Sequence, residues 1–315
     1  MELIKKALNG DKRSLSRIIS KAELGDEFQR EIMKSISPNI WNGYRIGITG
    51  PPGAGKSTIT NQLTKHYLNE GKKVAIIAVD PTSPFSGGAL LGDRIRMTDI
   101  GSEEGVFIRS MATRGSLGGL SEKTSDTADI LSAAGYDIIL IETVGVGQSE
   151  LDIANNADTT LVTLVPESGD SIQAMKAGLM EIADLYIINK SDRAGAESLV
   201  SAIKTILTLN DKSNDEWSPQ IIKSIATENV GTKEIAAKIE RHKEFLVKNN
   251  LLVERRLGHT RKKIEEIINS RLKKIIWNDD REKLIKKILP EIMNGSLSAH
   301  EAADQIILSY SNDNS

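Results

Sequence analysis

Seven short runs of apolar, often β-branched residues recur between residues 44 and 226, and helical stretches separate most of them. The runs are apolar throughout instead of alternating with polar residues, which is typical of strands buried on both faces. Strands that alternate with helices form a parallel sheet with right-handed crossovers. The pattern therefore predicts a three-layer α/β/α domain with a mostly parallel sheet. The runs are YRIGITG (44–50), KVAIIAVD (73–80), GVFIRS (105–110), YDIILIET (136–143), TTLVTLV (159–165), DLYIINK (184–190) and QIIKSIA (220–226).

Helical patterns lie on both sides of this predicted domain. In residues 1–40 apolar residues recur at steps of three and four, and Pro38 closes the segment. Beyond the last strand pattern come two long helical patterns, the second of which carries an apolar stripe from Leu257 to Ile276. We therefore expect an N-terminal helical extension over 1–40, the α/β domain over 41–240 and a C-terminal helical arm over 241–315.

Composition narrows the function classes. The 315 residues include no cysteine, which excludes disulfides and thiolate metal sites. The formal net charge is −2, so the chain as a whole has no strong field for nucleic acid or membrane partners. Residues 116–185 are acidic and residues 254–287 basic; each is either a solvated face or, for the basic stretch, a docking surface for an acidic partner. The N-terminus lacks a signal-peptide pattern and no run of about 18 apolar residues occurs, so we expect a cytoplasmic protein.

The segment Gly50-Pro51-Pro52-Gly53-Ala54-Gly55-Lys56-Ser57 has the spacing of a phosphate-binding loop, and it lies between a predicted strand and a predicted helix. Gly53 and Gly55 allow backbone N–H groups to turn inward, and the helix N-terminus adds a positive dipole end. Lys56 would reach the β- and γ-phosphates, and Ser57 would place its hydroxyl on Mg²⁺. The motif and its setting predict a P-loop NTPase.

The segment Asn189-Lys190-Ser191-Asp192 ends the sixth predicted strand and indicates the base. Asp192 can accept hydrogen bonds from N1–H and the amine of guanine, whereas adenine would leave the carboxylate unpaired. Lys190 can lay its alkyl stem along the purine, and Asn189 can tie the loops together. The same four-residue pattern also occurs in ordinary turns. Because it follows the sixth predicted strand of a P-loop domain, we interpret it as a guanine-binding segment, which favours GTP.

A second base loop is expected at residues 224–227, where Ile225-Ala226 replaces the usual Ser-Ala pair. A backbone contact to guanine would survive that change, whereas a serine hydroxyl contact would not. The predicted nucleotide contacts are Gly50, Pro51, Pro52, Gly53, Ala54, Gly55, Lys56, Ser57, Thr58, Asn189, Lys190, Asp192, Ile225, Ala226 and Thr227.

The segment ETVGVGQSE (142–150) follows the fourth predicted strand. Glu142 would hold Mg²⁺ directly or through water, and the Gly145 N–H can meet the γ-phosphate. Gln148 lies further along than the water-orienting glutamine of small signalling GTPases, so we expect slow intrinsic hydrolysis. Asp80 and Asp93, in the long loop after the second strand, are either magnesium groups or surface carboxylates. The catalytic candidates are Lys56, Glu142, Gly145 and Gln148, and the magnesium candidates are Ser57, Asp80, Asp93 and Glu142.

Together these stretches resemble the methylmalonyl-CoA mutase-associated GTPases of the MeaB/ArgK type over nearly the whole chain. The resemblance implies a homodimer formed through C-terminal helices, and a GTPase that is slow alone and faster when bound to an adenosylcobalamin-dependent mutase. It also implies a chaperone that gates cofactor loading and protects the mutase. Residues 80–97, 142–150 and 166–176 then look like nucleotide-sensing switches. The partner-responsive residues carried over are Gln148, Asp170 and Lys176; Asp170 could equally cap a helix.

Other classes fit less well. Older names in the family describe kinases linked to an arginine/ornithine (LAO/AO, ArgK-type) transport system, which is the main alternative, although the chain shows no separate acceptor site. A nickel metallochaperone GTPase needs Cys/His metal sites, and this chain has no cysteine and four scattered histidines. The intact Lys56, Ser57, Glu142 and Asp192 argue against a binding scaffold with a dead site. A protein-targeting GTPase would need a Met-rich helical domain, which seven scattered methionines do not supply.

Overall fold

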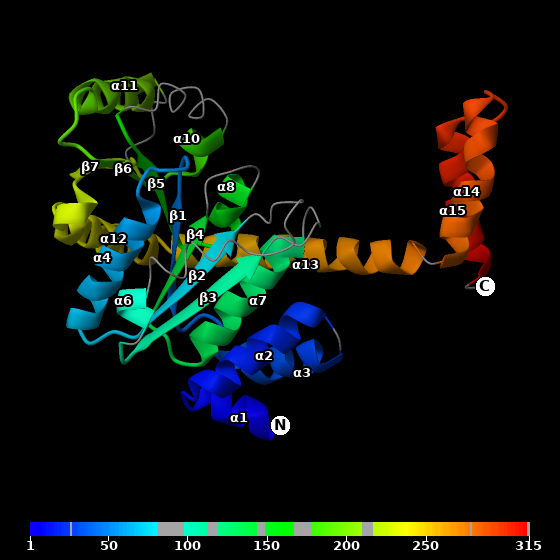
Figure 1. Cartoon of the computed structure of the whole chain (residues 1–315), viewed down its shortest axis with the longest axis horizontal. Helices are drawn as coiled ribbons and strands as arrows, with labels where there is room; N and C mark the ends of the chain where they lie inside the picture. Colours follow the sequence, from blue (N-terminus) through cyan, green and yellow to red (C-terminus); the bar gives the residue numbers. More distant parts are fainter. Residues whose placement is uncertain are drawn as a thin grey trace. The chain divides into compact units, whose positions relative to one another are not determined.

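The computed structural model of the chain describes residues 1–25, 27–80, 98–101, 103–112, 119–143, 149–166, 178–209, 217–277 and 279–313 (Figure 1). These residues form two compact units, Met1–Arg261 and Lys262–Ser315. Each unit has its own hydrophobic core. The division falls within helix α13 (Leu251–Ile276). None of the helices described is both long enough and apolar enough to cross a lipid bilayer.

The first unit is built around a seven-stranded sheet in the order β3-β2-β4-β1-β5-β6-β7. Every strand pair in this sheet is parallel, as expected for strands whose side chains are apolar on both faces. The prediction of an α/β fold with a parallel sheet is confirmed. The strands are β1 (Tyr44–Thr49), β2 (Val74–Asp80), β3 (Val106–Ala112), β4 (Ile138–Thr143), β5 (Thr159–Leu164), β6 (Leu185–Asn189) and β7 (Gln220–Ser224).

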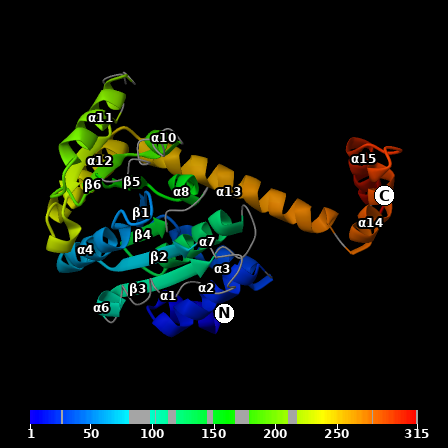
Figure 2. The ribbon, with the colours of Figure 1, turned by 45° about the horizontal axis from the view of Figure 1, so that its top comes forward.

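Helices cover both faces of the sheet and give three layers (Figure 2). On one face, α4 (Lys56–Asn69) and α12 (Thr232–Lys248) bury apolar side chains against the strands. On the other face, α7 (Gly119–Ala133) covers β2 and β4, and α11 (Ala196–Leu209) covers β5 and β6. The shorter elements of this unit are α1 (Glu2–Leu8), α2 (Lys12–Leu24), α3 (Glu27–Ile36), η1 (Ser37–Asn39), α6 (Thr98–Gly101), α8 (Ser149–Asp152), η2 (Ile153–Asn155), α10 (Met180–Ile182) and η4 (Ala226–Glu228).

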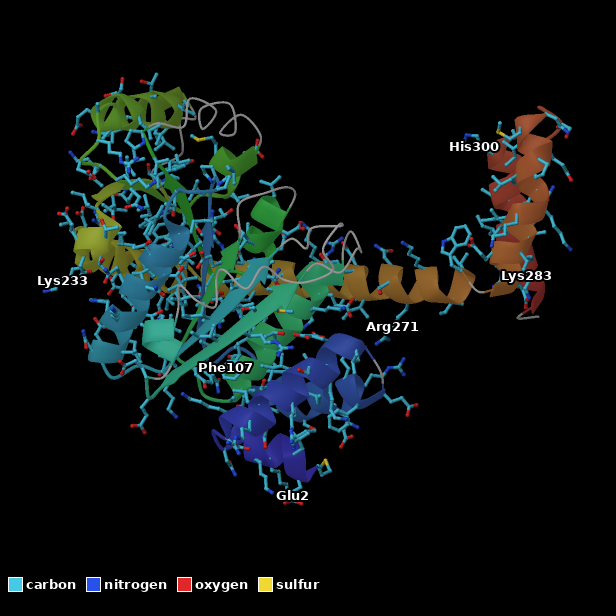
Figure 3. The ribbon with its side chains drawn as sticks, in the orientation of Figure 1. Glu2, Phe107, Lys233, Arg271, Lys283 and His300 are labelled. Carbon is cyan, nitrogen blue, oxygen red and sulfur yellow. The ribbon has the colours of Figure 1, made fainter. Side chains whose placement is uncertain are left out.

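The N-terminal helices α1, α2 and α3 belong to the first unit; α2 and α3 lie beside α7, and α1 packs on α2 (Figure 1). The Asp11 side chain caps α2 by accepting hydrogen bonds from two backbone N–H groups of its first turn. The apolar side of these helices joins the core that contains Phe107, labelled in Figure 3. Two polar contacts add to this packing: Arg109 of β3 binds both oxygens of Glu23 at 3.0 and 2.6 Å, and Gln29 donates to Asp126 at 2.6 Å.

The amino ends of β5 and β6 carry a buried charged edge. Asp158 and Asp184 directly precede these strands, and both are buried. Arg255 of α13 donates to both oxygens of Asp184 at 2.8 and 3.0 Å, and Arg256 donates to both oxygens of Asp158 at 2.8 Å. We call these two pairs the arginine clamp. Because each contact is bidentate and charge-assisted, the clamp fixes the start of α13 to the sheet.

The second unit contains α14 (Asp279–Met293) and α15 (Ala299–Asp313). The two helices pack through Ile288, Ala302 and Ile306, which are buried. Gly295, with a φ of 78°, lies in the turn between them. Large apolar side chains remain exposed on this unit, including Met293 at 86% and Leu308 at 60%.

Candidate functional site

The phosphate loop runs from the end of β1 to the start of α4, at the carboxyl edge of the sheet. At two of its positions only glycine fits, because atoms of other elements lie too close for a side chain. Gly50 has a φ of 134°, and a Cβ there would lie 2.0 Å from the carbonyl oxygen of Thr163, on β5. Gly55 has a φ of 89°, and a Cβ there would lie 2.2 Å from Asn189 Nδ2. The loop therefore packs closely against Thr163 of β5 and Asn189 at the end of β6 only because these two positions have no side chain.

Lys56 is the first residue of α4 and is buried beneath the loop. Its Nζ donates to the carbonyl oxygens of Gly50 at 2.8 Å and Pro51 at 2.9 Å. Gly55 precedes the helix and has no side chain to cap it. The backbone N–H groups at the helix start and the Lys56 ammonium thus give this end of the loop the positive character that phosphate requires.

Ser57 and Glu142 meet although 85 positions separate them in the sequence. The Ser57 hydroxyl donates to Glu142 Oε1 at 2.5 Å, and Thr60 Oγ1 lies 2.8 Å from Glu142 Oε2. Glu142 lies near the end of β4, which pairs with β1 on one side and β2 on the other. The structure therefore brings together two of the predicted magnesium residues, one from α4 and one from the sheet.

The donor set fits Mg²⁺, which prefers hydroxyl, carboxylate, phosphate and water oxygens. Among the described residues no group of three or more His, Cys, Asp or Glu side chains could hold a metal ion. A cation at Ser57 and Glu142 would thus take its other ligands from phosphate and water, as magnesium commonly does. Asp80 ends β2 beside β4, but its side chain, like the whole of Asp93, lies outside what the structure describes.

Asn189 joins the phosphate loop to the second base loop. Its Nδ2 donates to the Ala54 carbonyl at 2.8 Å, and its Oδ1 accepts from the Ala226 N–H at 3.1 Å. The Ala226 carbonyl in turn accepts from Gln62 Nε2 of α4 at 2.9 Å. The predicted tie between the loops is thus present as two hydrogen bonds from one buried amide.

The remaining predicted base contacts follow β6 and β7. Lys190 is half-buried with a φ of 54°, and Asp192 is exposed, so its carboxylate is accessible to a ligand. The Ser191 N–H donates to the Ser224 carbonyl at 3.1 Å and holds the two loops side by side. Ile225 is half-buried and Thr227 exposed. In the phosphate loop, Pro51 is half-buried, Pro52 and Gly53 are exposed, and Thr58 is half-buried on the first turn of α4.

Several predicted residues lie outside the described part of the chain. These are Asp93 in residues 81–97, Gly145 and Gln148 in residues 144–148, and Asp170 and Lys176 in residues 167–177. The strands that precede these three segments, β2, β4 and β5, all end at the carboxyl edge of the sheet.

Sequence reasoning missed Thr60 and Gln62. Both lie on α4 within two turns of Ser57, and each reaches an element far away in the sequence. The available signal was the helical spacing: residues three apart share a helix face, so Thr60 had to lie beside Ser57. The motif ends at Ser57, however, and gives no reason to look further along the helix.

Comparison with known proteins agrees with this geometry. Residues 14–281 match the family described as Methylmalonyl Co-A mutase-associated GTPase MeaB. A relative from Pyrococcus abyssi, assigned as a GTPase, is 46% identical over 312 residues, which cover 97% of this chain and 95% of the relative. The GTPase ArgK of Escherichia coli is 34% identical over 316 residues, which cover 97% of this chain and 95% of ArgK.

A solved structure is also similar over most of its length. The crystal structure of a LAO/AO transport system kinase has a TM-score of 0.73 and 28% identity, covering 97% of this chain and 95% of that one. The family match spans the phosphate loop, Glu142, the base loops and the arginine clamp. The resemblance seen in the motifs is confirmed, and the chain belongs to the family of methylmalonyl-CoA mutase-associated GTPases.

Proposed function

We propose that this GTPase is a chaperone that gates cofactor loading of an adenosylcobalamin-dependent mutase of the methylmalonyl-CoA type and protects that mutase. The family match over residues 14–281 carries the proposal, because the family description itself names the association with the mutase. In this proposal the protein works in the cytoplasm as a homodimer formed through its C-terminal helices, with neither nucleic acid nor membrane as partner. The exposed apolar side chains of the second unit, such as Met293 and Leu308, support the dimer.

The proposed chemistry is hydrolysis of GTP to GDP and phosphate. Lys56 would balance the charge of the β- and γ-phosphates, and Asp192 would select guanine. Ser57 and Glu142 would hold Mg²⁺, which when bound neutralises charge on the phosphates. Water adds to the γ-phosphorus and gives up a proton to the phosphate oxygens or to solvent, the bond from that phosphorus to the bridging oxygen breaks, and the oxygen leaves with GDP.

Slow turnover in the free protein follows from the spacing of the proposed catalytic residues. In the sequence, Gln148 lies beyond Val146-Gly147 and is not next to Gly145. In this proposal Gly145 would face the γ-phosphate, and the spacing would leave the Gln148 amide without a neighbour that positions it. A mutase that contacts residues 142–150 and 166–176 would position the catalytic groups, through Gln148, Asp170 and Lys176. Binding of GTP and of mutase would then be linked reciprocally.

The test is GTP turnover with and without a purified adenosylcobalamin-dependent mutase. We expect turnover to rise when the mutase is added, and mutase affinity to differ between GDP and a non-hydrolysable GTP analogue. Lys56→Ala is the control, because loss of the phosphate-binding cation should abolish turnover in both conditions. Equal turnover and equal affinity with every such mutase from the source cell would overturn the chaperone role and leave a GTPase with another output.

A second candidate is a nucleotide-dependent kinase linked to a transport system. It is favoured by the similarity to the LAO/AO transport system kinase, at a TM-score of 0.73. The two functions differ in where the γ-phosphate goes: a kinase transfers it to a protein side chain, whereas a GTPase releases it to water. Nucleotide labelled in the γ-phosphate distinguishes them, since only the kinase leaves label on a protein.

A further inference from the structure

Thr60 contacts the carboxylate that Ser57 contacts, from one turn further along α4. Ser57 Oγ lies 2.5 Å from Glu142 Oε1, and Thr60 Oγ1 lies 2.8 Å from Glu142 Oε2. Thr60 is fully buried, and Glu142 is 5% exposed. We propose that Thr60 is a positioning residue of the magnesium site, which holds the Glu142 carboxylate in the orientation that leaves Ser57 able to bind the cation. The proposal rests on the proposed GTP and Mg²⁺ site.

The hydrogen-bonding capacity of Ser57 explains why this orientation matters. A hydroxyl has one proton to donate and two lone pairs that accept. When Ser57 donates its proton to Glu142 Oε1, its lone pairs are left for a cation. The terminal torsion of a glutamate side chain has a broad profile and sets no single orientation by itself. A second donor on Oε2 is therefore needed to keep Oε1 facing Ser57.

Thr60 has two acceptors within reach of its one proton. The Lys56 carbonyl oxygen lies 3.0 Å away, and Glu142 Oε2 lies 2.8 Å away. A charged carboxylate is the stronger acceptor, so the proton goes to Glu142. Thr64, one turn further along α4, shows the contrast: it is equally buried, and its hydroxyl donates to the Thr60 carbonyl at 2.7 Å, as a threonine inside a helix commonly does.

The chain thus offers a matched pair of variants. Thr60→Val removes the hydroxyl that faces Glu142, and Thr64→Val removes a buried hydroxyl of the same helix that faces only backbone. Thr60→Ser restores the hydroxyl. The measurement is a Mg²⁺ titration of the full-length protein bound to a fluorescent GDP, together with GDP affinity in EDTA and thermal unfolding in EDTA.

For Thr60→Val we expect Mg²⁺ affinity of the GDP complex to fall about tenfold or more, the usual effect of losing a group that orients a metal ligand. GDP affinity in EDTA should stay within about twofold of wild type, and Thr60→Ser and Thr64→Val should keep the wild-type Mg²⁺ midpoint. If Thr60→Val does not fold, Thr60→Ala removes the same hydroxyl and carries the same expectation.

An unchanged Mg²⁺ midpoint in Thr60→Val, while wild type responds to Mg²⁺, would overturn the role of Thr60 alone. Equal losses in Thr60→Val and Thr64→Val would also overturn it, because the effect would then belong to the helix. If the fluorescence of the wild-type GDP complex did not change when Mg²⁺ was added, the magnesium site itself would be overturned, and the role of Thr60 with it.

Discussion

At Gly55 the backbone has a φ of 89°, and the Asn189 amide lies against the α-carbon. A methyl group there would sit 2.2 Å from Asn189 Nδ2, so Gly55→Ala would displace the side chain that joins the two nucleotide loops. Gly53 is a matched control: it has a φ of 75°, but an added methyl group would meet no described atom within 4 Å.

We expect Gly55→Ala to lower the free energy of unfolding of the nucleotide-free protein more than Gly53→Ala does. The Gly53 variant should lose only the cost of a left-handed backbone, about 1–2 kcal/mol, whereas the Gly55 variant also loses the Asn189 contacts. Denaturant unfolding of both variants without nucleotide provides the measurement. Similar losses would mean that Asn189 can move aside at little cost.

The sequence predicted the site residues that belong to motifs, because motif spacing follows from local geometry. Lys56 and Ser57 lie on one turn of one helix. Asn189 ends its apolar strand and Glu142 lies near the end of its own, so a parallel sheet places both residues at the carboxyl edge. Thr60 and Gln62 could not be predicted in this way. Their partners, Glu142 and Ala226, are 82 and 164 positions away, and only the packed fold brings them together.

At the scale of elements, the acidic residues 116–185 and the basic residues 254–287 meet within the chain. Asp158 and Asp184 come from the first stretch, and Arg255 and Arg256 from the second. The sequence suggested solvated faces or a docking surface, because charge counts do not show which residues pair. In the structure, these four side chains form the arginine clamp.

The same edge holds a buried histidine, His242 of α12. Its Nδ1 lies 2.8 Å from Thr159 Oγ1, which also contacts the Tyr44 hydroxyl at 2.6 Å, and its Nε2 lies 3.3 Å from Asp184 Oδ1. Burial lowers the pKa of His242 to about 4, against a smaller opposing effect of the Asp184 charge; Arg255 lowers that pKa further, and Asp158 raises it. His242 is therefore neutral in the folded protein at neutral pH.

A lowered histidine pKa predicts how stability changes with pH. Below about pH 6.5 the unfolded chain binds a proton at this position and the folded chain does not, so the free energy of unfolding falls as the pH drops from about 6.5 to about 4. The loss approaches roughly 3 kcal/mol for one such histidine. His242→Gln should make this fall shallower, measured by denaturant unfolding at pH 7.5 and pH 5.

His259 of α13 has its pKa lowered to about 4 by the same cause, so the fall should become shallower in His242→Gln without disappearing. His300→Gln is the surface control; this residue lies on α15 in the second unit (Figure 3). If the free energy of unfolding fell as steeply with pH in His242→Gln as in wild type, the folded protein would take up the proton at His242 without losing stability.

At the scale of the whole molecule, the division after Arg261 determines where the chain can be cut. A chain ending at residue 261 keeps the clamp and the buried His242 and Leu246. A chain ending at residue 240 loses all of these, including both arginines that pair with Asp158 and Asp184 and the side chains that pack beside them. Its first unit would therefore be incompletely packed.

We therefore expect residues 1–261 to fold as a monomer that retains GTP binding and basal turnover, while the full-length chain is a dimer. Residues 1–240 should unfold at a much lower temperature. Light scattering gives the oligomeric state and thermal unfolding the stability. If residues 1–261 scattered as the same oligomer as the full chain, the C-terminal helices would not be the dimer contact.

The double contact of Asn189, with Ala54 on one side and Ala226 on the other, has a consequence for synthesis on the ribosome. A nascent chain that has emerged through β5 already carries the phosphate loop, Ser57 and Glu142. The amide that braces the loop arrives with β6, and the backbone N–H that braces the amide arrives only with η4, after β7. Because domains mature as units while the chain grows, competence to hold guanine should appear abruptly and late, and ribosome-bound chains halted before residue 226 should not retain GTP.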